Sequence, residues 1–265
     1  MFTLDKTSKN FNNDSLKTPP PHKQLHIDDN WKRIGIRLSG GADSAILYYA
    51  ICNYFKDRSD VKIYPLTMDT EYKWWYSSGA KRVIDRVSEL TGKHPAEHYV
   101  HYYPHYTEYA YKYQKHKYVD GIDELQALAL RKFNLDSVYI GVTVNPPLDT
   151  MKTYFLNTDH GLDVEKAVGY IDSRDKTRDI QEEKEVRYVH YDNGSEEVKA
   201  TQVIPFANAD KSAVKKMYDY YDVTDLLFPY TYSCEIVPES KTQPLVHCGH
   251  CFFCLERWWG FGRIL

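Results

Sequence analysis

The order of apolar and polar positions predicts alternating strands and helices over the first 145 residues. Short apolar runs at 33–38, 61–68, 96–100 and 137–144 are typical of strands. Longer segments at 45–51, 78–91 and 123–134 have helical spacing, as shown by Val83, Ile84, Val87 and Leu90. Strands that alternate with helices favour an α/β fold with a doubly wound, mostly parallel sheet.

The second half of the chain predicts a β-hairpin after a polar stretch at 146–182 that matches no clear pattern. Strands are expected at 185–191 and 197–204, on either side of Asp192-Asn193-Gly194-Ser195. An Asn-Gly pair supplies the positive φ angles that a tight hairpin turn requires. A helix is expected at 210–221, with Asn208 or Asp210 available as its N-cap.

The same pattern divides the chain into three parts. Residues 1–25 are polar and include three consecutive prolines, so we expect a flexible N-terminal arm. Residues 26–230 are expected to form the α/β domain, in which the hairpin at about 185–204 is interpreted as an insertion. Residues 231–265 contain four of the five cysteines and are expected to form a C-terminal zinc-binding segment.

Composition changes this picture little. The chain has 265 residues, 42% of them hydrophobic and 27% charged, with a formal net charge of −3. This charge gives no sign of general nucleic-acid binding. The sequence has no apolar run of about 18 residues and no apolar signal-peptide core, so we expect no membrane span and a reducing, cytoplasmic location.

The clearest candidate for chemistry is Ser39-Gly40-Gly41-Ala42-Asp43-Ser44, between the first strand and the first helix. Glycines let the backbone approach an anion, and a helix N-terminus offers N–H groups and a positive dipole end. The two serine hydroxyls add donors, so the loop suits a pyrophosphate group. A plain glycine-rich turn is the alternative, which we do not favour. The segment is not the Walker pattern, because no lysine follows the glycines.

The loop is identical to the Ser-Gly-Gly-x-Asp-Ser signature of the PP-loop ATP pyrophosphatases, and the chain resembles that superfamily from about Trp31 to Val144. The resemblance implies an adenine nucleotide alpha hydrolase-like fold. It also implies ATP as substrate, with its β- and γ-phosphates in the loop, Mg²⁺ held with help from Asp43, and release of pyrophosphate. Two further nucleotide contacts are predicted at strand ends, Asp69 and Gly141. A solvated carboxylate and an ordinary strand glycine are their respective alternatives.

The cysteines form a second candidate site, Cys234-x13-Cys248-x2-Cys251-x2-Cys254. Four thiolates at this spacing predict a closed tetrahedral Zn²⁺ site, with Gly249 helping the knuckle turn. A redox pair and an iron–sulfur cluster remain alternatives. The fifth cysteine, Cys52, is expected to be a buried apolar residue.

The C-terminal residues resemble those of one family within this superfamily. Thr231-Tyr232-Ser233-Cys234 followed by Cys248-Gly249-His250-Cys251-Phe252-Phe253-Cys254-Leu255-Glu256-Arg257 is similar to the end of 7-cyano-7-deazaguanine synthases. This resemblance implies a structural zinc, a nucleobase-like acid as substrate, and ammonia as the nucleophile. The chain departs from that family at Asp69-Thr70-Glu71-Tyr72 and lacks its Tyr-Pro-Asp-Cys-Arg-like stretch. The sequence therefore leaves the exact acid open.

Lys211 is the candidate for stabilising negative charge during adenylylation, although a surface lysine is the alternative. The tyrosine-rich segment 99–118, with Lys112, Lys115 and Lys117, would suit nucleic acid, but we favour aromatic packing there. A monomer and a homodimer both fit the sequence. Three rival functions remain: a PP-loop tRNA sulfurtransferase, an adenylyl-sulfate reductase-like enzyme, and a non-catalytic nucleotide-binding module.

Overall fold

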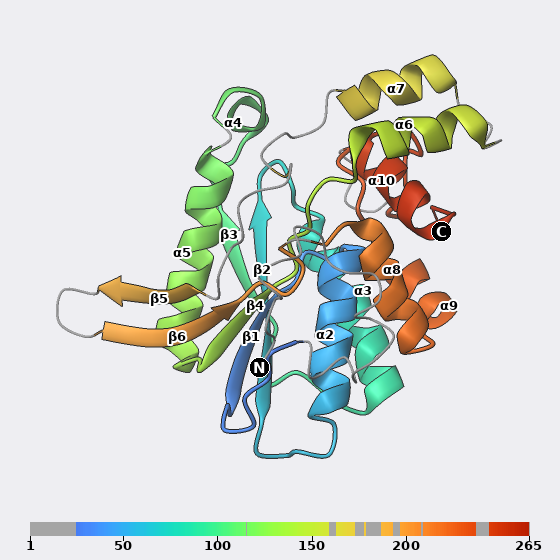
Figure 1. Ribbon diagram of the computed structural model, residues 1–265. Coiled ribbons are helices and arrows are strands. Elements are labelled where there is room, and N and C mark those ends of the chain that lie inside the picture. The colour runs from blue at the N-terminus through green and yellow to red at the C-terminus, as the bar shows by residue number, and fades with distance from the viewer. Residues whose placement is uncertain are drawn as a thin grey trace.

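A six-stranded sheet in the order β3-β2-β1-β4-β6-β5 organises the computed structural model (Figure 1). The structure describes residues 25–264 except 115, 159–162, 173–177, 179–186, 193–196, 208 and 237–243. Five strands run parallel, namely β1 (Arg33–Arg37), β2 (Lys62–Thr70), β3 (Tyr99–Tyr103), β4 (Ser137–Ile140) and β6 (Glu197–Val203). The sixth, β5 (Arg187–Asp192), is antiparallel to β6. The predicted mostly parallel, doubly wound α/β fold is confirmed.

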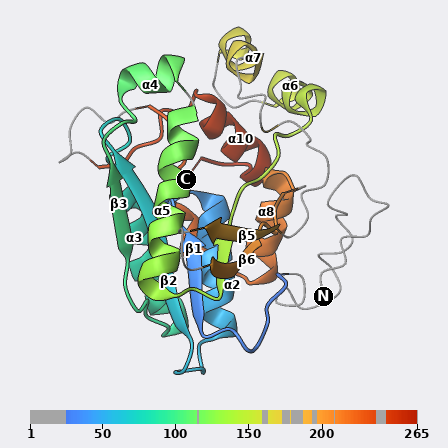
Figure 2. The same ribbon diagram turned by 90° about the vertical axis from the view of Figure 1, so that its left-hand side faces the viewer.

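Helices cover both faces of this sheet (Figures 1 and 2). On one face lie α2 (Ala42–Tyr54), α3 (Tyr76–Thr91) and α8 (Lys211–Tyr220), and α5 (His116–Phe133) lies on the other. The helix α2 is buried along nearly all its length, which agrees with its lack of a polar face. It is packed between the sheet, α3 and α8, so it is the central helix of the larger core.

The remaining helices lie towards the end of the sheet where the parallel strands finish (Figure 1). They are α4 (Glu108–Tyr113), α6 (Leu148–Asn157), α7 (Val164–Asp172) and α10 (Phe252–Phe261). Two short elements, α9 (Thr224–Leu227) and the 3-10 helix η3 (Phe228–Tyr230), follow α8. The helices α6, α7 and α10 share a separate hydrophobic cluster built on Met151, Phe155, Ile171 and Leu255.

Pro65 lies inside β2, where a proline would normally remove a ladder hydrogen bond. It is tolerated because β3 begins beyond it. The Ile63 carbonyl accepts a hydrogen bond from the Ala96 N–H on the β3 side, and the backbone nitrogen of Pro65, two residues further along β2, points to the same side. The pairing of β2 with β3 starts only at Leu66 and Tyr99, so Pro65 leaves no ladder partner without a donor.

The predicted hairpin strands are present, and they belong to the main sheet. β5 and β6 pair from Asp192–Glu197 to Arg187–Gln202, and β6 also pairs in parallel with β4 from Ser137 to Tyr139. The Asn193-Gly194 turn itself lies outside the described residues. The same holds for residues 1–24 of the expected N-terminal arm, so the proposed three-part division stays a prediction.

No helix among the described residues combines the length and the apolar character that crossing a bilayer demands.

Candidate functional site

The Ser39–Ser44 loop lies at the point where the strand order reverses. From β1 the chain moves outward to β2 and β3, whereas β4 and β6 lie on the other side of β1. In open α/β sheets, ligands bind beyond the carboxyl ends of the strands at such a switch point. The loop joins the carboxyl end of β1 to the start of α2, with Ala42 as the first helical residue. The predicted loop is therefore in the place where this fold class holds its ligands.

The shape of the loop depends on its first glycine. Gly40 has a φ of +82°, and a Cβ there would lie 2.6 Å from the backbone carbon of Gly79 in α3. Both facts exclude a larger residue. The hydroxyls of Ser39 and Ser44 lie 3.4 Å apart across the loop, and Ser44 also donates to the Gly41 carbonyl. Two hydroxyls therefore lie beside the first N–H groups of α2, as an anion site requires.

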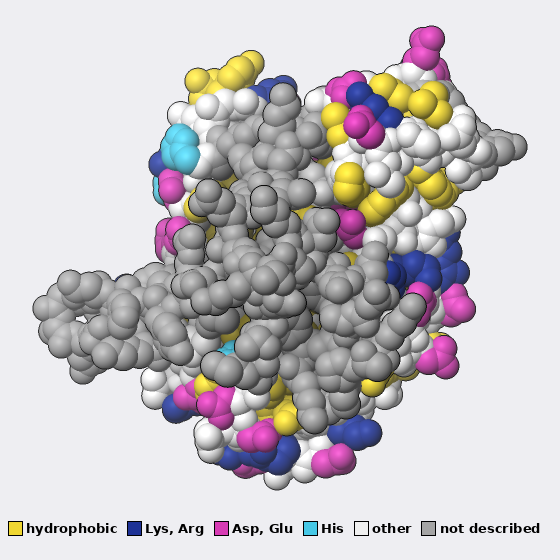
Figure 3. Space-filling model, viewed as in Figure 1, with side chains coloured by type: hydrophobic (Ala, Val, Ile, Leu, Met, Phe, Trp, Pro, Cys, Tyr) yellow, Lys and Arg dark blue, Asp and Glu magenta, His cyan; other side chains and the backbone are white. Residues whose placement is uncertain are grey.

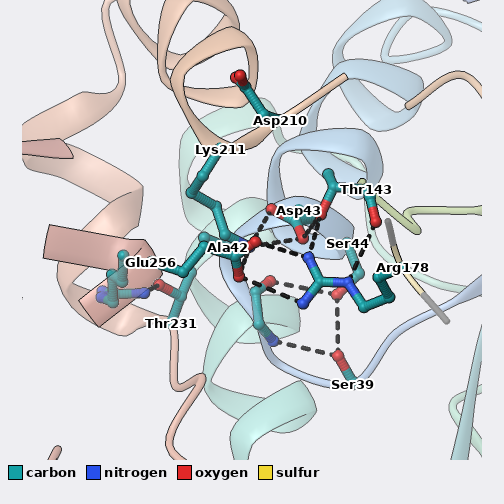
Figure 4. A network of polar contacts seen from close by, with 12 residues as sticks. Ser39, Ala42, Asp43, Ser44, Thr143, Arg178, Asp210, Lys211, Thr231 and Glu256 are labelled. Atoms are coloured by element: carbon teal, nitrogen blue, oxygen red, sulfur yellow. Dashed lines mark hydrogen bonds and ion pairs between the residues drawn. The ribbon is translucent and has the colours of Figure 1, made fainter. Parts of the chain in front are cut away.

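Asp43 and Lys211 form the central contact of the site (Figure 4). The Nζ atom of Lys211 donates to both carboxylate oxygens of Asp43 at 2.7 Å. Lys211 is the first residue of α8 and is only 4% exposed, because Gly260 of α10 packs against its stem. The alternative of a surface lysine is thus wrong, and the buried ammonium is directed at the loop.

Glu256 and Arg178 extend this contact into a charged network (Figure 4). Glu256 on α10 is fully buried and accepts from Arg178 Nη2 at 2.6 Å, with Lys211 Nζ 3.6 Å away. Arg178 also donates to Thr143, whose hydroxyl donates to Asp43 at 3.2 Å. Burial would raise the pKa of Glu256, but the charges of Arg178 and Lys211 outweigh it and lower that pKa. Two carboxylates and two cations are thus balanced beside the loop.

The two predicted strand-end contacts have different surroundings. Asp69 accepts from the backbone N–H of Ser77 at 2.8 Å and from the Ser77 hydroxyl, so it holds the start of α3. A Cβ on Gly141 would lie 3.0 Å from the backbone N of Ser44. Gly141 is therefore needed for β4 to pack against the loop. Nucleotide contact by either residue stays a prediction.

The four predicted cysteines come together at the C-terminal segment. Their sulfur atoms all lie within 4.8 Å of one another, with Cys248 and Cys254 at 3.8 Å and Cys234 and Cys251 at 4.0 Å. The N–H groups of His250 and Cys251 point at the Cys248 sulfur, and Gly249 has a φ of +79°. This is the predicted knuckle. Hydrogen bonds with the other three cysteines, Cys234 first, lower the pKa of the Cys248 thiol.

These sulfur distances fit one metal ion. With Zn–S bonds of about 2.3 Å, the sulfurs of a tetrahedral site lie about 3.8 Å apart. An iron–sulfur cluster places irons and sulfides between its cysteine ligands, so their sulfurs would stand farther apart than the 4.8 Å limit here. The group is therefore a metal site whose spacing matches zinc. The fifth cysteine, Cys52, is fully buried in the core cluster around α2, as predicted.

Residues 231–233 of the C-terminal segment lie directly against the Ser39–Ser44 loop. The Tyr232 N–H donates to the Gly40 carbonyl at 2.8 Å, and the Ser233 hydroxyl would lie 3.6 Å from a Cβ on Gly41. Behind this contact, the buried Arg257 donates to the Thr231 hydroxyl at 2.6 Å. Residues 231–233 therefore form one wall beside the loop and are held there by α10.

The tyrosine-rich segment divides between core and surface. Tyr103 and Tyr106 are buried, whereas Tyr109 and Tyr113 of α4 are 62% and 71% exposed. Hydrophobic side chains gather on the surface over α4 (Figure 3). The cations predicted beside them are neutralised, because Lys112 pairs with Glu108 and Lys117 pairs with Asp120, while Lys115 lies outside the described residues. Nucleic-acid binding there remains untested.

Comparison with known proteins finds similarity in structure and none in sequence. No family model and no curated protein matches the chain. Among solved structures, the chain is similar to "U34-tRNA thiolase NcsA from Methanococcus maripaludis with its [4Fe-4S] cluster", at a TM-score of 0.46 and 14% sequence identity. The similarity covers 83% of this chain and 65% of the thiolase, so the chain spans about two thirds of its length. The strand order of this chain itself defines its doubly wound fold.

Sequence reasoning missed Glu256, Arg178 and Thr143. A signal for Glu256 was present, because Glu256 and Arg257 interrupt the otherwise apolar run 251–259, and a carboxylate buried in such a helix requires a cation. Arg178 stands in the polar stretch 146–182, whose sequence gives no sign that a single arginine returns to the loop. Thr143 was seen only as part of a strand.

Proposed function

We propose that this chain is an ATP-dependent enzyme of the PP-loop ATP pyrophosphatase type. It cleaves ATP between the α- and β-phosphates and transfers AMP to a substrate oxygen. One observation carries the proposal: the Ser39–Ser44 loop lies at the switch point of the sheet with the buried ammonium of Lys211 beside it. A glycine turn with only a structural role gives no reason to bury a lysine next to it.

Different groups of the loop would bind the phosphates and the Mg²⁺ of MgATP. The backbone from Gly40 to Ser44 and the hydroxyls of Ser39 and Ser44 would bind the β- and γ-phosphates. Asp43 would supply a hard oxygen ligand to Mg²⁺. Both of its oxygens accept hydrogen bonds from Lys211, so the ammonium lies beside the place where Asp43 would hold Mg²⁺. From there the ammonium would supply positive charge to a phosphate oxygen.

The chemical step forms one bond and breaks one bond. A substrate carboxylate or amide oxygen attacks the α-phosphorus, and the bond to the bridging oxygen breaks, so that pyrophosphate leaves with the electron pair. Negative charge grows on the departing oxygens, where Lys211 and Arg178 supply positive charge. An attacking nitrogen then displaces AMP from the activated carbon. No side chain has to form a covalent intermediate.

The finer proposal is an activity like that of 7-cyano-7-deazaguanine synthases. Ammonia would convert a deazaguanine carboxylate to the amide, and a second ATP would activate the amide oxygen so that loss of AMP leaves the nitrile. The four-cysteine site and the wall formed by residues 231–233 support this assignment. The sulfur spacing favours a structural zinc over the iron–sulfur cluster of a rival sulfurtransferase. In this role zinc fixes α10 and stays outside the reaction.

A product assay tests the proposal. The protein is incubated with ATP, Mg²⁺, ammonium and 7-carboxy-7-deazaguanine, and AMP, pyrophosphate and the nitrile are quantified. We expect two AMP and two pyrophosphate for each nitrile. Pyrophosphate and AMP with a different acid would retain the adenylylation chemistry and remove the deazaguanine assignment. Formation of ADP and phosphate would contradict both, and stoichiometric iron in the purified protein would favour the sulfurtransferase.

A further inference from the structure

The carboxylate of Glu256 links the C-terminal segment to the Ser39–Ser44 loop through two cations, Arg178 and Lys211. Glu256 lies in α10, two residues beyond Cys254, and is fully buried. Its two oxygens face different cations. Oε1 accepts from Arg178 Nη2 at 2.6 Å, and Oε2 lies 3.4 Å from Arg178 Nη1 and 3.6 Å from Lys211 Nζ.

Each of the two cations is also linked to Asp43 of the loop, Lys211 directly and Arg178 through Thr143. Lys211 donates directly to both oxygens of Asp43. Arg178 donates to the hydroxyl of Thr143 at 2.9 Å, and that hydroxyl donates to Asp43. Lys211 is buried and the Arg178 side chain is only 17% exposed, so without a shared counter-charge the two cations would repel each other with little water to solvate them.

Lys211 and Arg178 both pack against α10, the helix that carries Glu256. Gly260, one helical turn later on α10, leaves room for the Lys211 stem, since a Cβ there would lie 2.7 Å from Lys211 Cγ. The Arg178 guanidinium lies 5.4 Å above the ring of Phe253, also on α10. Both cations therefore lie against the same helix face that presents Glu256.

We propose that Glu256 is a positioning residue that holds Lys211 and Arg178 side by side as a two-cation clamp for the triphosphate of ATP. The proposal rests on the proposed function and deepens it, because it assigns Arg178 to phosphate recognition and gives α10 a role beyond metal binding. Glu256 does not touch ATP. It acts through the two cations, so its effect disappears when the cation that it positions is removed.

A double-mutant cycle in ATP affinity tests this role. The variants are Glu256→Gln, Lys211→Met and the double variant, measured by calorimetric titration of the metal-loaded protein with a non-hydrolysable ATP analogue and Mg²⁺. Glu256→Gln keeps the shape and removes the charge, and we expect affinity to fall roughly tenfold. Lys211→Met keeps the packed stem. We expect the double variant to lose less affinity than the product of the two single losses predicts, because both substitutions disrupt the same clamp.

The matched control is Glu235→Gln, which also breaks a buried ion pair. Glu235 accepts from Lys73, whose side chain is 7% exposed, and both residues also contact the Tyr76 hydroxyl. This variant should lose stability and keep its ATP affinity. Zinc content and thermal midpoint, measured on every variant, separate a misplaced clamp from a damaged fold.

The outcomes distinguish this proposal from the one on which it rests. If the unmodified protein does not bind the analogue, the proposed function fails. If it binds and Lys211→Met weakens binding while Glu256→Gln has unchanged or tighter affinity, the positioning role is overturned. Tighter binding by Glu256→Gln would mean that the negative charge of Glu256 only repels the phosphates of ATP. Losses that simply multiply in the double variant would also overturn it.

Discussion

Lys211 donates to both carboxylate oxygens of Asp43 at 2.7 Å, although 168 residues separate them in sequence. The contact joins the start of α8 to the start of α2 at the carboxyl end of the sheet. A lysine at a helix N-terminus is disfavoured by the helix dipole. Its burial there is explained by the charge opposite it now and by the phosphates that we propose it meets during turnover.

Replacing Lys211 should slow the chemistry far more than it harms the fold. Lys211→Met retains the stem that packs against Gly260 and removes the charge facing the loop. We expect kcat to fall about 10²- to 10³-fold, as for the loss of one group that stabilises transition-state charge. The measurement is steady-state pyrophosphate release. The control Lys215→Met removes an exposed lysine of the same helix that pairs with Asp219, and it should retain full activity.

Replacing Asp43 should abolish turnover. Asp43→Asn keeps the size of the side chain and removes the charge that Mg²⁺ and Lys211 share. Circular dichroism should show a folded protein, and pyrophosphate release should fall to background. The matched variant Asp85→Asn alters an exposed carboxylate that pairs with Lys81 on α3 and should behave as the unmodified protein. Full turnover by Asp43→Asn would remove the assignment of the loop.

Removing one cysteine ligand should cost both the metal and the C-terminal structure. Cys251 is the N-cap of α10 as well as one of the four clustered thiols. Cys251→Ser should lower the zinc content below one per chain and lower the thermal midpoint, because a structural zinc contributes directly to folding. Cys52→Ala, in the core far along α2, should keep its zinc. A Cys251→Ser protein with full zinc and an unchanged midpoint would contradict the site.

Two glycines give a paired test of how tightly the loop is packed. A Cβ on Gly141 would meet the backbone of Asp43 and Ser44 at 3.0 to 3.1 Å, whereas one on Gly169 in α7 meets nothing within 4 Å. Gly141→Ala should destabilise the protein by about 1–3 kcal/mol and weaken ATP binding. Gly169→Ala should stabilise it by up to about 1 kcal/mol, since alanine favours a helix interior. Chemical denaturation measures both, and equal effects would contradict the packing.

The elements that the sequence predicted well are those whose signal is local. The loop, the strands before and after it, and the Cys-x2-Cys knuckle follow from residues that are adjacent in sequence. The helices α6 and α7 were missed because each is short, and they pack on each other and on α10. β4 ends at Ile140, earlier than the predicted 144, and Gly141 after it packs closely against the loop.

The charged network was the part that the sequence could not predict. Asp43, Arg178, Lys211 and Glu256 come from four separate segments, and no spacing rule relates them. Lys211 was predicted as a functional candidate that stabilises negative charge during adenylylation. That Glu256, close to the cysteines in sequence, lies beside this ammonium could not be predicted from spacing. Such long-range charge pairing is visible only once the helices are packed.

The central claim is that the Ser39–Ser44 loop holds the triphosphate of ATP, and a crystal structure with α,β-methylene-ATP and Mg²⁺ tests it most directly. We predict that the β- and γ-phosphates lie within hydrogen-bond distance of the loop backbone, with Mg²⁺ on Asp43 and the Lys211 ammonium on a phosphate oxygen. A structure in which the nucleotide lies elsewhere, with Lys211 still bound to both oxygens of Asp43, would contradict the account.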